Sequence, residues 1–306
     1  MTAGADRPPR VLVTGGAGFI GRHVVAELRA RGHAPSVVDR HDHPDDGVPA
    51  VRGELDDPGV RDRAVTDDLD AIVHLAAETS VLGSVERPAL VHRTNVEITA
   101  ALLELARERG VSTFVLASTN AVAGPHEGVL TEEVPLSPMT PYGATKAAGE
   151  MILSGYSGAY GMRTPALRLT NVYGPGMHHK DSFIPRLLRA AADDGEVQIY
   201  GDGLQRRDLV HVSDVAQAFA HAVAGWPSGP VIVGSGHSHT VLDLLEAARD
   251  ATGRPIAARH VPPKPGEMPA VVVDNGRARA RGWDPAVSLL EGVRSAWADF
   301  SPAARS

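Results

Sequence analysis

Residues Arg10–Gly21 read RVLVTGGAGFIG, a short apolar run followed by three glycines in the spacing G-x-x-G-x-x-G. The residues that follow carry apolar side chains at helical spacing as far as Gly32. A strand, a glycine-rich turn and a helix form the arrangement in which backbone N–H groups and the positive end of a helix bind a dinucleotide diphosphate. The segment therefore predicts the start of a nucleotide-binding α/β domain. The residues expected at the cofactor are Gly15, Gly18, Phe19 and Ile20.

The acidic residue after the next predicted strand bears on which dinucleotide is bound. The predicted strand Ser36-Val37-Val38 ends in Asp39, 18 residues after Gly21. A carboxylate at this place accepts hydrogen bonds from the ribose hydroxyls of NAD and repels the 2′-phosphate of NADP. Asp39 therefore predicts NAD. The adjacent Arg40, also expected at the cofactor, leaves NADP open because it could pair with a 2′-phosphate.

Strands and helices continue to alternate as far as residue 170. The further predicted strands are 51–55, 70–74, 113–116 and 166–169, and the predicted long helices are 84–109 and 142–160. This alternation is typical of an α/β fold with a doubly wound parallel (Rossmann) sheet. Such a sheet binds ligands at the carboxyl ends of its strands.

Composition limits the classes of protein. The 306 residues suffice for one large domain or two tightly packed ones. A net charge of −7 argues against a nucleic-acid partner, and no apolar run approaches the roughly 20 residues of a membrane span. The lack of cysteine excludes disulfides and fits a cytoplasmic enzyme. The adjacent His178 and His179 have no third ligand at a recognisable spacing, so we expect no metal.

Tyr142 and Lys146 form the most informative pair. They stand four residues apart, on one face of the predicted helix. A lysine cation about 4 Å from a phenol, at an effective dielectric of about 20, favours the phenolate by about 4 kcal/mol, or roughly three pK units. On this argument the pKa of Tyr142 falls far enough for proton transfer near neutral pH. A chance pair of surface residues is the alternative, but the chain contains only three lysines.

Six motifs together carry a family resemblance. They are residues 14–21, His74-Leu75-Ala76-Ala77, Asn95, Ser118-Thr119, the Tyr142/Lys146 pair and residues 171–176, NVYGPG. In their order and spacing the chain resembles the extended short-chain dehydrogenase/reductases over about residues 10–300. Within them it is most similar to the nucleotide-sugar epimerase/dehydratase group typified by UDP-galactose 4-epimerase. The resemblance implies NAD as cofactor and a nucleotide-sugar substrate.

The resemblance also implies roles for single residues. Tyr142 takes the proton from a sugar hydroxyl, usually O4, while NAD takes hydride from the same carbon. Thr119 hydrogen-bonds that hydroxyl. The other residues expected at the dinucleotide are Glu54, Leu55, Ala76, Ala77, Asn95 and Lys146. Asn95 could equally be a packing residue of its helix.

The absence of a second acid and base beside Thr119 limits which reaction of the family is expected. In the 4,6-dehydratases of the family an Asp-Glu pair follows the threonine and eliminates water, whereas this chain has Asn120 and Ala121. Without that acid and base, the 4-keto intermediate is expected to receive hydride back on its other face. The predicted reaction is epimerisation at C4 of a UDP-hexose or UDP-hexuronate. An NDP-hexose 4-ketoreductase or dehydrogenase is the alternative, and a non-enzymatic NAD sensor would not need the Thr119, Tyr142 and Lys146 set.

After residue 170 short segments rich in proline and glycine predict a second domain. We expect an NAD-binding domain over 1–170 with a return segment near 208–230, and a smaller C-terminal substrate-binding domain over 171–306. By the resemblance, the substrate-binding residues are Thr119, Asn120, Asn171, Tyr200, Arg207, Lys264, Glu267 and Val271. Val271 would form the far wall of the sugar pocket, or else is an ordinary strand residue. A homodimer seam is expected on two helices, through Ala101, Leu102, Leu105, Met151, Ile152 and Tyr156.

Overall fold

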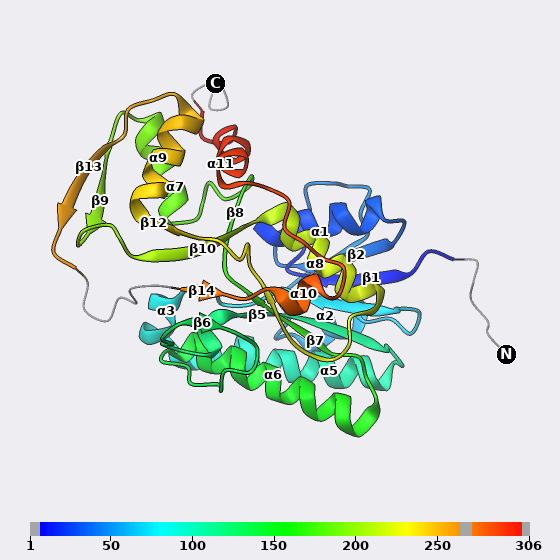
Figure 1. Ribbon diagram of the computed structural model, residues 1–306. Helices are drawn as coiled ribbons and strands as arrows, with labels where there is room; N and C mark the ends of the chain where they lie inside the picture. The colour runs from blue at the N-terminus through cyan, green and yellow to red at the C-terminus, as the bar shows by residue number, and fades with distance from the viewer. Residues whose placement is uncertain (1–6, 264–270, 302–306) are drawn as a thin grey trace.

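A seven-stranded sheet forms the centre of the computed structural model, which describes residues 7–263 and 271–301 (Figure 1). In sheet order the strands are β11 (Gly229–Val233), β7 (Pro165–Leu169), β5 (Thr113–Thr119), β4 (Ala71–His74), β1 (Arg10–Thr14), β2 (Ala34–Asp39) and β3 (Ala50–Arg52). Every neighbouring pair is parallel. The predicted doubly wound α/β fold is therefore confirmed.

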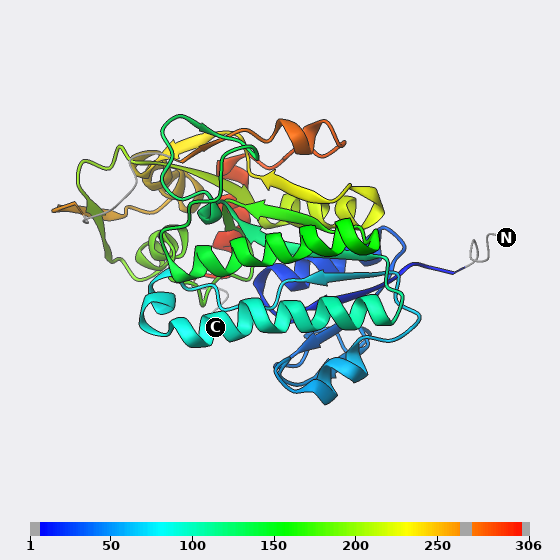
Figure 2. The same ribbon diagram turned by 90° about the horizontal axis from the view of Figure 1, so that it is seen from below.

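Helices cover both faces of this sheet. One face carries α1 (Phe19–Ala30) and α8 (Val212–Gly225), and the other carries α2 (Pro58–Ala64), α5 (Ile98–Glu108) and α6 (Pro141–Tyr160). Figure 2 shows α5 and α6 running side by side across the second face. Successive residues of β1 alternate between the two cores, with Val11 and Val13 in one and Leu12 in the other. No helix in the described ranges is long and apolar enough to cross a membrane.

The long helix expected over 84–109 is broken in the structure. It consists of α3 (Val81–Glu86), α4 (Pro88–His92), a π-helical turn (Arg93–Glu97) and α5. Pro88 explains the break, because proline cannot donate a helical hydrogen bond and its predecessor is pushed out of the helical region. Within α5, Leu102 is fully buried against the sheet, so its assignment to a dimer seam is wrong.

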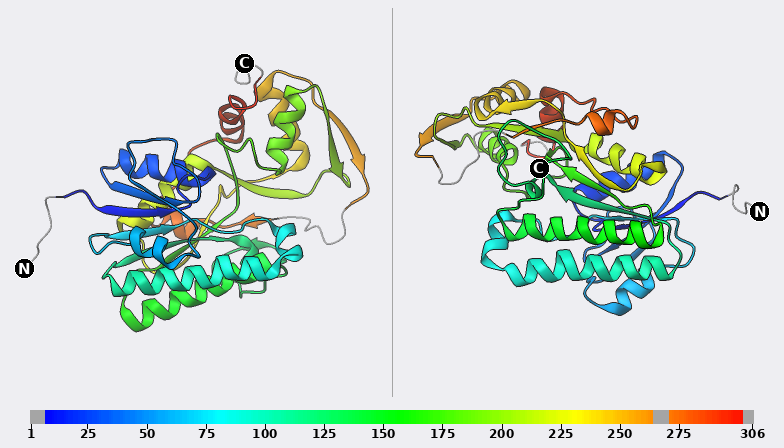
Figure 3. Two further views of the ribbon diagram at one scale, coloured as in Figure 1. Left: turned by 180° about the vertical axis from the view of Figure 1, so that it is seen from behind. Right: turned by 60° about the horizontal axis from the view of Figure 1, so that its bottom comes forward.

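A smaller unit stands over the carboxyl end of the sheet (Figure 3). Its elements are α7 (Phe183–Ala192), α9 (Val241–Thr252), α11 (Leu289–Trp297) and the paired strands β9 (Glu196–Tyr200) and β13 (Ala257–Val261). They share one apolar core, which also contains Phe19 from the first turn of α1. The chain leaves the large sheet after β7, returns to it through α8 and β11, and leaves it again.

Two small sheets lie between these parts. β10 (Arg206–His211) pairs with β8 (Asn171–Tyr173) and with β12 (Ser238–Thr240). β14 (Val272–Val273) pairs with β6 (Val129–Leu130), and α10 (Gly276–Arg279) follows it. The first sheet brings Asn171 and Arg207, which are distant in sequence, to the same side of the molecule.

Candidate active site and cofactor site

The glycine-rich turn between β1 and α1 forms a cradle for a diphosphate. Gly15 has a φ of +69°, and a Cβ there would lie 2.9 Å from the nitrogen of Ala76. A Cβ on Gly21 would lie 2.2 Å from the carbonyl oxygen of Gly15, so any other residue would push α1 away from the turn. Gly18 precedes α1 and has no side chain to cap it. The first N–H groups of the helix, at Phe19 and Ile20, are thus available to an anion.

Asp39 is held firmly at the end of β2. Its Oδ2 accepts the N–H of Ala17 at 3.0 Å and its Oδ1 accepts the N–H of His41 at 2.9 Å. Its side chain is 9% exposed, whereas that of Arg40 is 56% exposed and lies 3.9 Å from Glu54. The carboxylate therefore faces the glycine-rich turn and the guanidinium lies at the surface. This geometry suits the ribose of NAD, so the residues present fit the cofactor.

Asn95 connects the loop after β4 to the catalytic helix. In the π-helical turn, its Nδ2 donates to Glu78 O at 3.0 Å and to Thr145 Oγ1 at 3.1 Å, while its Oδ1 accepts the N–H of Glu78 at 2.9 Å. Thr145 in turn donates to the carbonyl of Tyr142 at 2.8 Å. Because its amide is engaged by protein groups, Asn95 would act on a dinucleotide through the loop that contains Ala76 and Ala77.

His74 is a core histidine, as its apolar neighbours predict. It is 1% exposed, and its two ring nitrogens lie 2.7 Å from Thr14 Oγ1 and 3.0 Å from Thr99 Oγ1. Burial, and next the charge of Lys146, lowers the pKa of His74 to about 3. The ring is therefore neutral and positions the strand end. Glu54 and Leu55, which were expected at the dinucleotide, differ in exposure: Leu55 is buried in the core and Glu54 is exposed.

Thr119, Tyr142 and Lys146 meet where β5 ends and α6 begins. Thr119 is the last residue of β5, and its side chain acts on the phenol of Tyr142, whose pKa it lowers. The Thr140 side chain caps α6 by accepting the N–H of Gly143 at 3.2 Å. A Cβ on Gly143 would lie 2.7 Å from the Ala121 oxygen, so glycine lets the catalytic helix approach the loop after β5. Lys146 is 5% exposed, one turn farther along α6.

The expected lowering of the Tyr142 pKa is wrong for this structure. Burial raises the pKa of the phenol, and the neighbouring Thr119 side chain opposes this only in part. Burial also lowers the pKa of Lys146 to about 8. The loss of water around the two groups disfavours their charged forms and outweighs the attraction expected between the charges.

The loop after Thr119 carries no acid at its first two positions. Residues Asn120–Val122 form a 3₁₀ turn, and Thr119 Oγ1 accepts the N–H of Ala121 at 3.2 Å. Asn120 and Ala121 therefore stand directly beside the hydroxyl of Thr119, where neither side chain can exchange a proton with a substrate.

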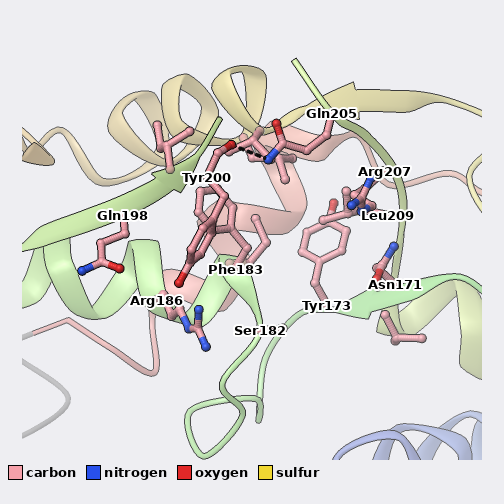
Figure 4. A pocket seen from close by; sticks show the side chains of 15 residues that line it. Asn171, Tyr173, Ser182, Phe183, Arg186, Gln198, Tyr200, Gln205, Arg207 and Leu209 are labelled. Atoms are coloured by element: carbon pink, nitrogen blue, oxygen red, sulfur yellow. Dashed lines mark hydrogen bonds between the residues drawn. The ribbon is translucent and has the colours of Figure 1, made fainter. Parts of the chain in front are cut away.

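A cavity of about 240 Å³ lies between the small sheet of β8 and β10 and the elements α7, β9 and α9 of the smaller unit (Figure 4). Three of the predicted substrate residues line it: Asn171 on β8, Tyr200 on β9 and Arg207 on β10. The Asn171 amide is held by a hydrogen bond of 2.9 Å to the Asp208 carbonyl. Figure 4 shows Asn171 and Arg207 on one side of the cavity and Tyr200 on the other.

Sequence reasoning missed six polar or aromatic residues of this cavity. They are Tyr173, Ser182, Phe183, Arg186, Gln198 and Gln205. Gln205 Nε2 donates to the Tyr200 carbonyl at 3.0 Å and so fixes the end of β9 (Figure 4). Gln198 was detectable, because residues two apart on a strand face the same side and Tyr200 was already assigned. Phe183 and Arg186 stand three apart on α7, which no motif marked.

Three further residues were predicted to bind the substrate, but none of them is among the described residues that line this cavity. Lys264 and Glu267 lie outside the described residues. Val271 is 9% exposed and packs in a small apolar cluster with Ala123 and Leu130, so its role as a pocket wall stays a prediction. Within the described ranges, no group of histidine or acidic side chains could hold a metal ion.

Comparison with known proteins identifies the family. The sequence profile described as the NAD dependent epimerase/dehydratase family matches residues 11–233. The UDP-glucose 4-epimerase of Mycolicibacterium smegmatis is 34% identical, with 93% of this chain and 96% of that protein covered. The dTDP-glucose 4,6-dehydratase of Streptomyces niveus is 35% identical, with 93% and 90% covered.

Solved structures of similar proteins support the same family. The UDP-glucose 4-epimerase of Thermus thermophilus in complex with NAD has a TM-score of 0.89 at 36% identity, covering 95% of this chain and 98% of that one. MoeE5 in complex with UDP-glucuronic acid and NAD has a TM-score of 0.86 at 34% identity, covering 94% and 97%.

The glycine-rich turn, the parallel sheet and the Thr119, Tyr142 and Lys146 set thus define an extended short-chain dehydrogenase/reductase. More narrowly, the chain belongs to the NAD-dependent epimerase/dehydratase family. The prediction of NAD as cofactor is confirmed.

Proposed function

We propose that this enzyme epimerises a UDP-sugar at C4 through a 4-keto intermediate. One observation carries the proposal. The proton-transfer group Tyr142 and its partner Thr119 are present, but the neighbouring Asn120 and Ala121 cannot supply the second acid and base that elimination of water needs. An intermediate formed here can only be reduced again at the carbon where it was oxidised.

The chain's own groups account for the proton in this reaction. NAD, when bound, accepts the C4 hydride and returns it. The phenolate of Tyr142 takes the O4 proton as the carbonyl forms and gives it back when hydride returns to the opposite face, so the net reaction consumes no oxidant. The Thr119 side chain lowers the pKa of Tyr142 and so lowers the cost of holding a negative charge there. The Lys146 ammonium favours the same phenolate.

Epimerisation requires the sugar to turn while the nucleotide stays bound. Arg207 and Tyr200 line the cavity at a distance from Tyr142 along the chain and on other elements. A guanidinium forks onto phosphate oxygens and an aromatic ring packs on a pyrimidine base. Anchoring the substrate at its nucleotide end leaves the sugar free to rotate. UDP-hexuronates belong to the proposed range because MoeE5, which is similar throughout, has been solved with UDP-glucuronic acid.

The test is an assay of the purified protein without added NAD in D₂O. UDP-glucose, UDP-N-acetylglucosamine and UDP-glucuronate would each be supplied, and the C4 epimers resolved chromatographically. We expect one pair to interconvert from both directions, with no deuterium entering the sugar. Tyr142→Phe should keep NAD bound and lower turnover by several orders of magnitude, because it removes only the proton-transfer group.

Other outcomes would point elsewhere. Deuterium at C5 with loss of the C6 hydroxyl would show dehydration, the activity named for the Streptomyces niveus relative. A requirement for stoichiometric NAD(H) would show the alternative 4-ketoreductase or dehydrogenase. Near-normal turnover in Tyr142→Phe would refute the assigned proton transfer.

A further inference from the structure

The loop that follows β8 crosses the first turn of α1. His23 Nε2 lies 3.0 Å from the Pro175 carbonyl oxygen, and Phe19 packs in the same apolar core as Met177. At Gly176, where φ is +89°, a Cβ would lie 3.0 Å from Nη2 of Arg22. The guanidinium of Arg22 therefore lies in the space that glycine leaves beside the cofactor turn.

Arg22 has no counter-ion in the part of the chain that the structure describes. Its side chain is half-buried, yet no hydrogen bond or ion pair joins it to residues 7–263 or 271–301. A second cation, Lys180, acts on the same neighbouring histidine as Arg22. Burial, and then the charges of Lys180, His178 and Arg22, lower the pKa of His179, so these three side chains all lie within electrostatic range of that ring.

The carboxylates beside this cluster are engaged elsewhere. Asp181 lies 2.6 Å from Arg186 and 3.3 Å from Arg189, and Asp299 accepts the N–H of Gly176. Lys180 is half-buried and, among the described residues, has no anionic partner, and burial lowers its pKa. A half-buried cation without a partner is unfavourable, because it loses water and gains no opposite charge. The cluster is therefore suited to an anion from outside the chain.

The position of Arg22 identifies that anion. Arg22 is the fourth residue of α1, and helical side chains lean toward the N-terminus, so its guanidinium extends toward the free N–H groups of Phe19 and Ile20. The diphosphate of NAD carries two negative charges, and a guanidinium can bind two of its oxygens at once. We propose that Arg22, assisted by Lys180 across the loop, binds the cofactor diphosphate. The proposal concerns the cofactor alone and does not depend on the proposed reaction.

The test compares NAD affinities of protein freed of nucleotide. Arg22→Met keeps the apolar stem and removes the charge, so the Kd for NAD measured by calorimetry should rise about tenfold or more. Lys180→Met should raise it less, and binding of adenosine, which has no phosphate, should not change. Added salt should weaken NAD binding less in Arg22→Met than in the unchanged protein.

Arg29→Met is the matched control. Arg29 stands on the last turn of the same helix and pairs with Asp45, away from the glycine-rich turn. This variant should bind NAD normally. The proposal would be overturned if folded Arg22→Met bound NAD with unchanged affinity, or if NAD and adenosine weakened equally. Weaker binding of UDP with normal binding of NAD would also overturn it, because the cluster would then serve the substrate.

Discussion

Tyr142 and Lys146 lie one helical turn apart on α6, and we expect them to titrate as a pair that sets how activity depends on pH. Burial raises the pKa of the phenol and lowers that of the ammonium to about 8. The active form, phenolate with ammonium, carries one proton fewer than the fully protonated pair, so it becomes populated only once that proton is lost. We expect kcat/KM to rise with pH up to about 8 and then to level off.

A variant separates the two groups. In Lys146→Met the proton must leave the phenol itself, whose pKa is raised, so the rising limb should move to higher pH than in the unchanged enzyme. The pH dependence of kcat/KM over pH 6 to 10 measures this. If the rising part of the pH profile stayed at the same pH in Lys146→Met, the phenol would not titrate together with Lys146.

Asp39 should decide between the two nicotinamide cofactors. Its nearly buried carboxylate faces the glycine-rich turn, and a clash with a 2′-phosphate would cost NADP at least about 2 kcal/mol, or roughly thirtyfold in affinity. Asp39→Ala should remove most of this preference, measured by calorimetry on nucleotide-free protein. Arg40→Ala, at the exposed neighbour, should leave it in place. Equal affinities for NAD and NADP in the unchanged protein would contradict the assignment.

Single site residues could be predicted from the sequence wherever a motif coincided with the end of a predicted strand. Asp39, Thr119 and Lys146 lie where their motifs predicted. Arg186 and Phe183 were missed because they enter the cavity from α7, and their positions depend on how the smaller unit packs against the sheet. The pKa of Tyr142 was misjudged for a related reason, since burial is a property of the assembled structure.

Among the elements, β5, β7 and α6 are joined by one buried ion pair. Arg168 on β7 donates to Glu150 on α6 at 2.8 and 3.0 Å, and Glu150 accepts the hydroxyl of Ser118 on β5 at 2.5 Å. Both charged side chains are nearly buried, at 5% and 7% exposure. Glu150 also stands one turn after Lys146, so the pair fixes the helix that carries the catalytic residues.

Glu150→Gln should lower the free energy of unfolding by about 3–5 kcal/mol, because it leaves Arg168 buried without a counter-ion. Urea unfolding with saturating NAD measures this. The control is Asp42→Asn, which breaks an exposed pair with Arg52 and should cost less than about 1 kcal/mol. A loss as small as that of the control would mean that water reaches Arg168.

The bounds of helices and strands could be predicted from the sequence where a capping or turn residue stands at the end of the element. The catalytic helix α6 begins after its Thr140 cap, within one residue of the predicted start, and it ends at Tyr160, where it was expected to end. The break at Pro88 was visible in the sequence and was overlooked because apolar residues continue on both sides of it. The π-helical turn around Asn95 had no signal, since its hydrogen bonds are made to a loop and to another helix.

For the whole molecule, we propose a homodimer through the outer faces of α5 and α6. Figure 2 shows the two helices side by side on one face, and Met151 and Tyr160 on α6 are 62% and 57% exposed. Met151→Glu should convert a dimer into a monomer in light scattering at micromolar concentration, because it places a charge in an apolar contact. Leu204→Glu, at a residue 58% exposed outside these helices, should not. A monomeric unchanged protein would refute the seam.

The return of the chain to the large sheet has a consequence for its synthesis. β7 pairs with β11, but 59 residues, which include α7 and β9 of the smaller unit and the helix α8, lie between Leu169 and Gly229. At a translation rate of about 5–20 residues per second, β7 waits roughly 3–12 s for that partner after it has been made. During this time an apolar strand edge stays unpaired, which is a template for pairing with another chain. A newborn chain is thus exposed to aggregation until about Val233 has left the ribosome, and slowing translation between these two strands would lengthen that period.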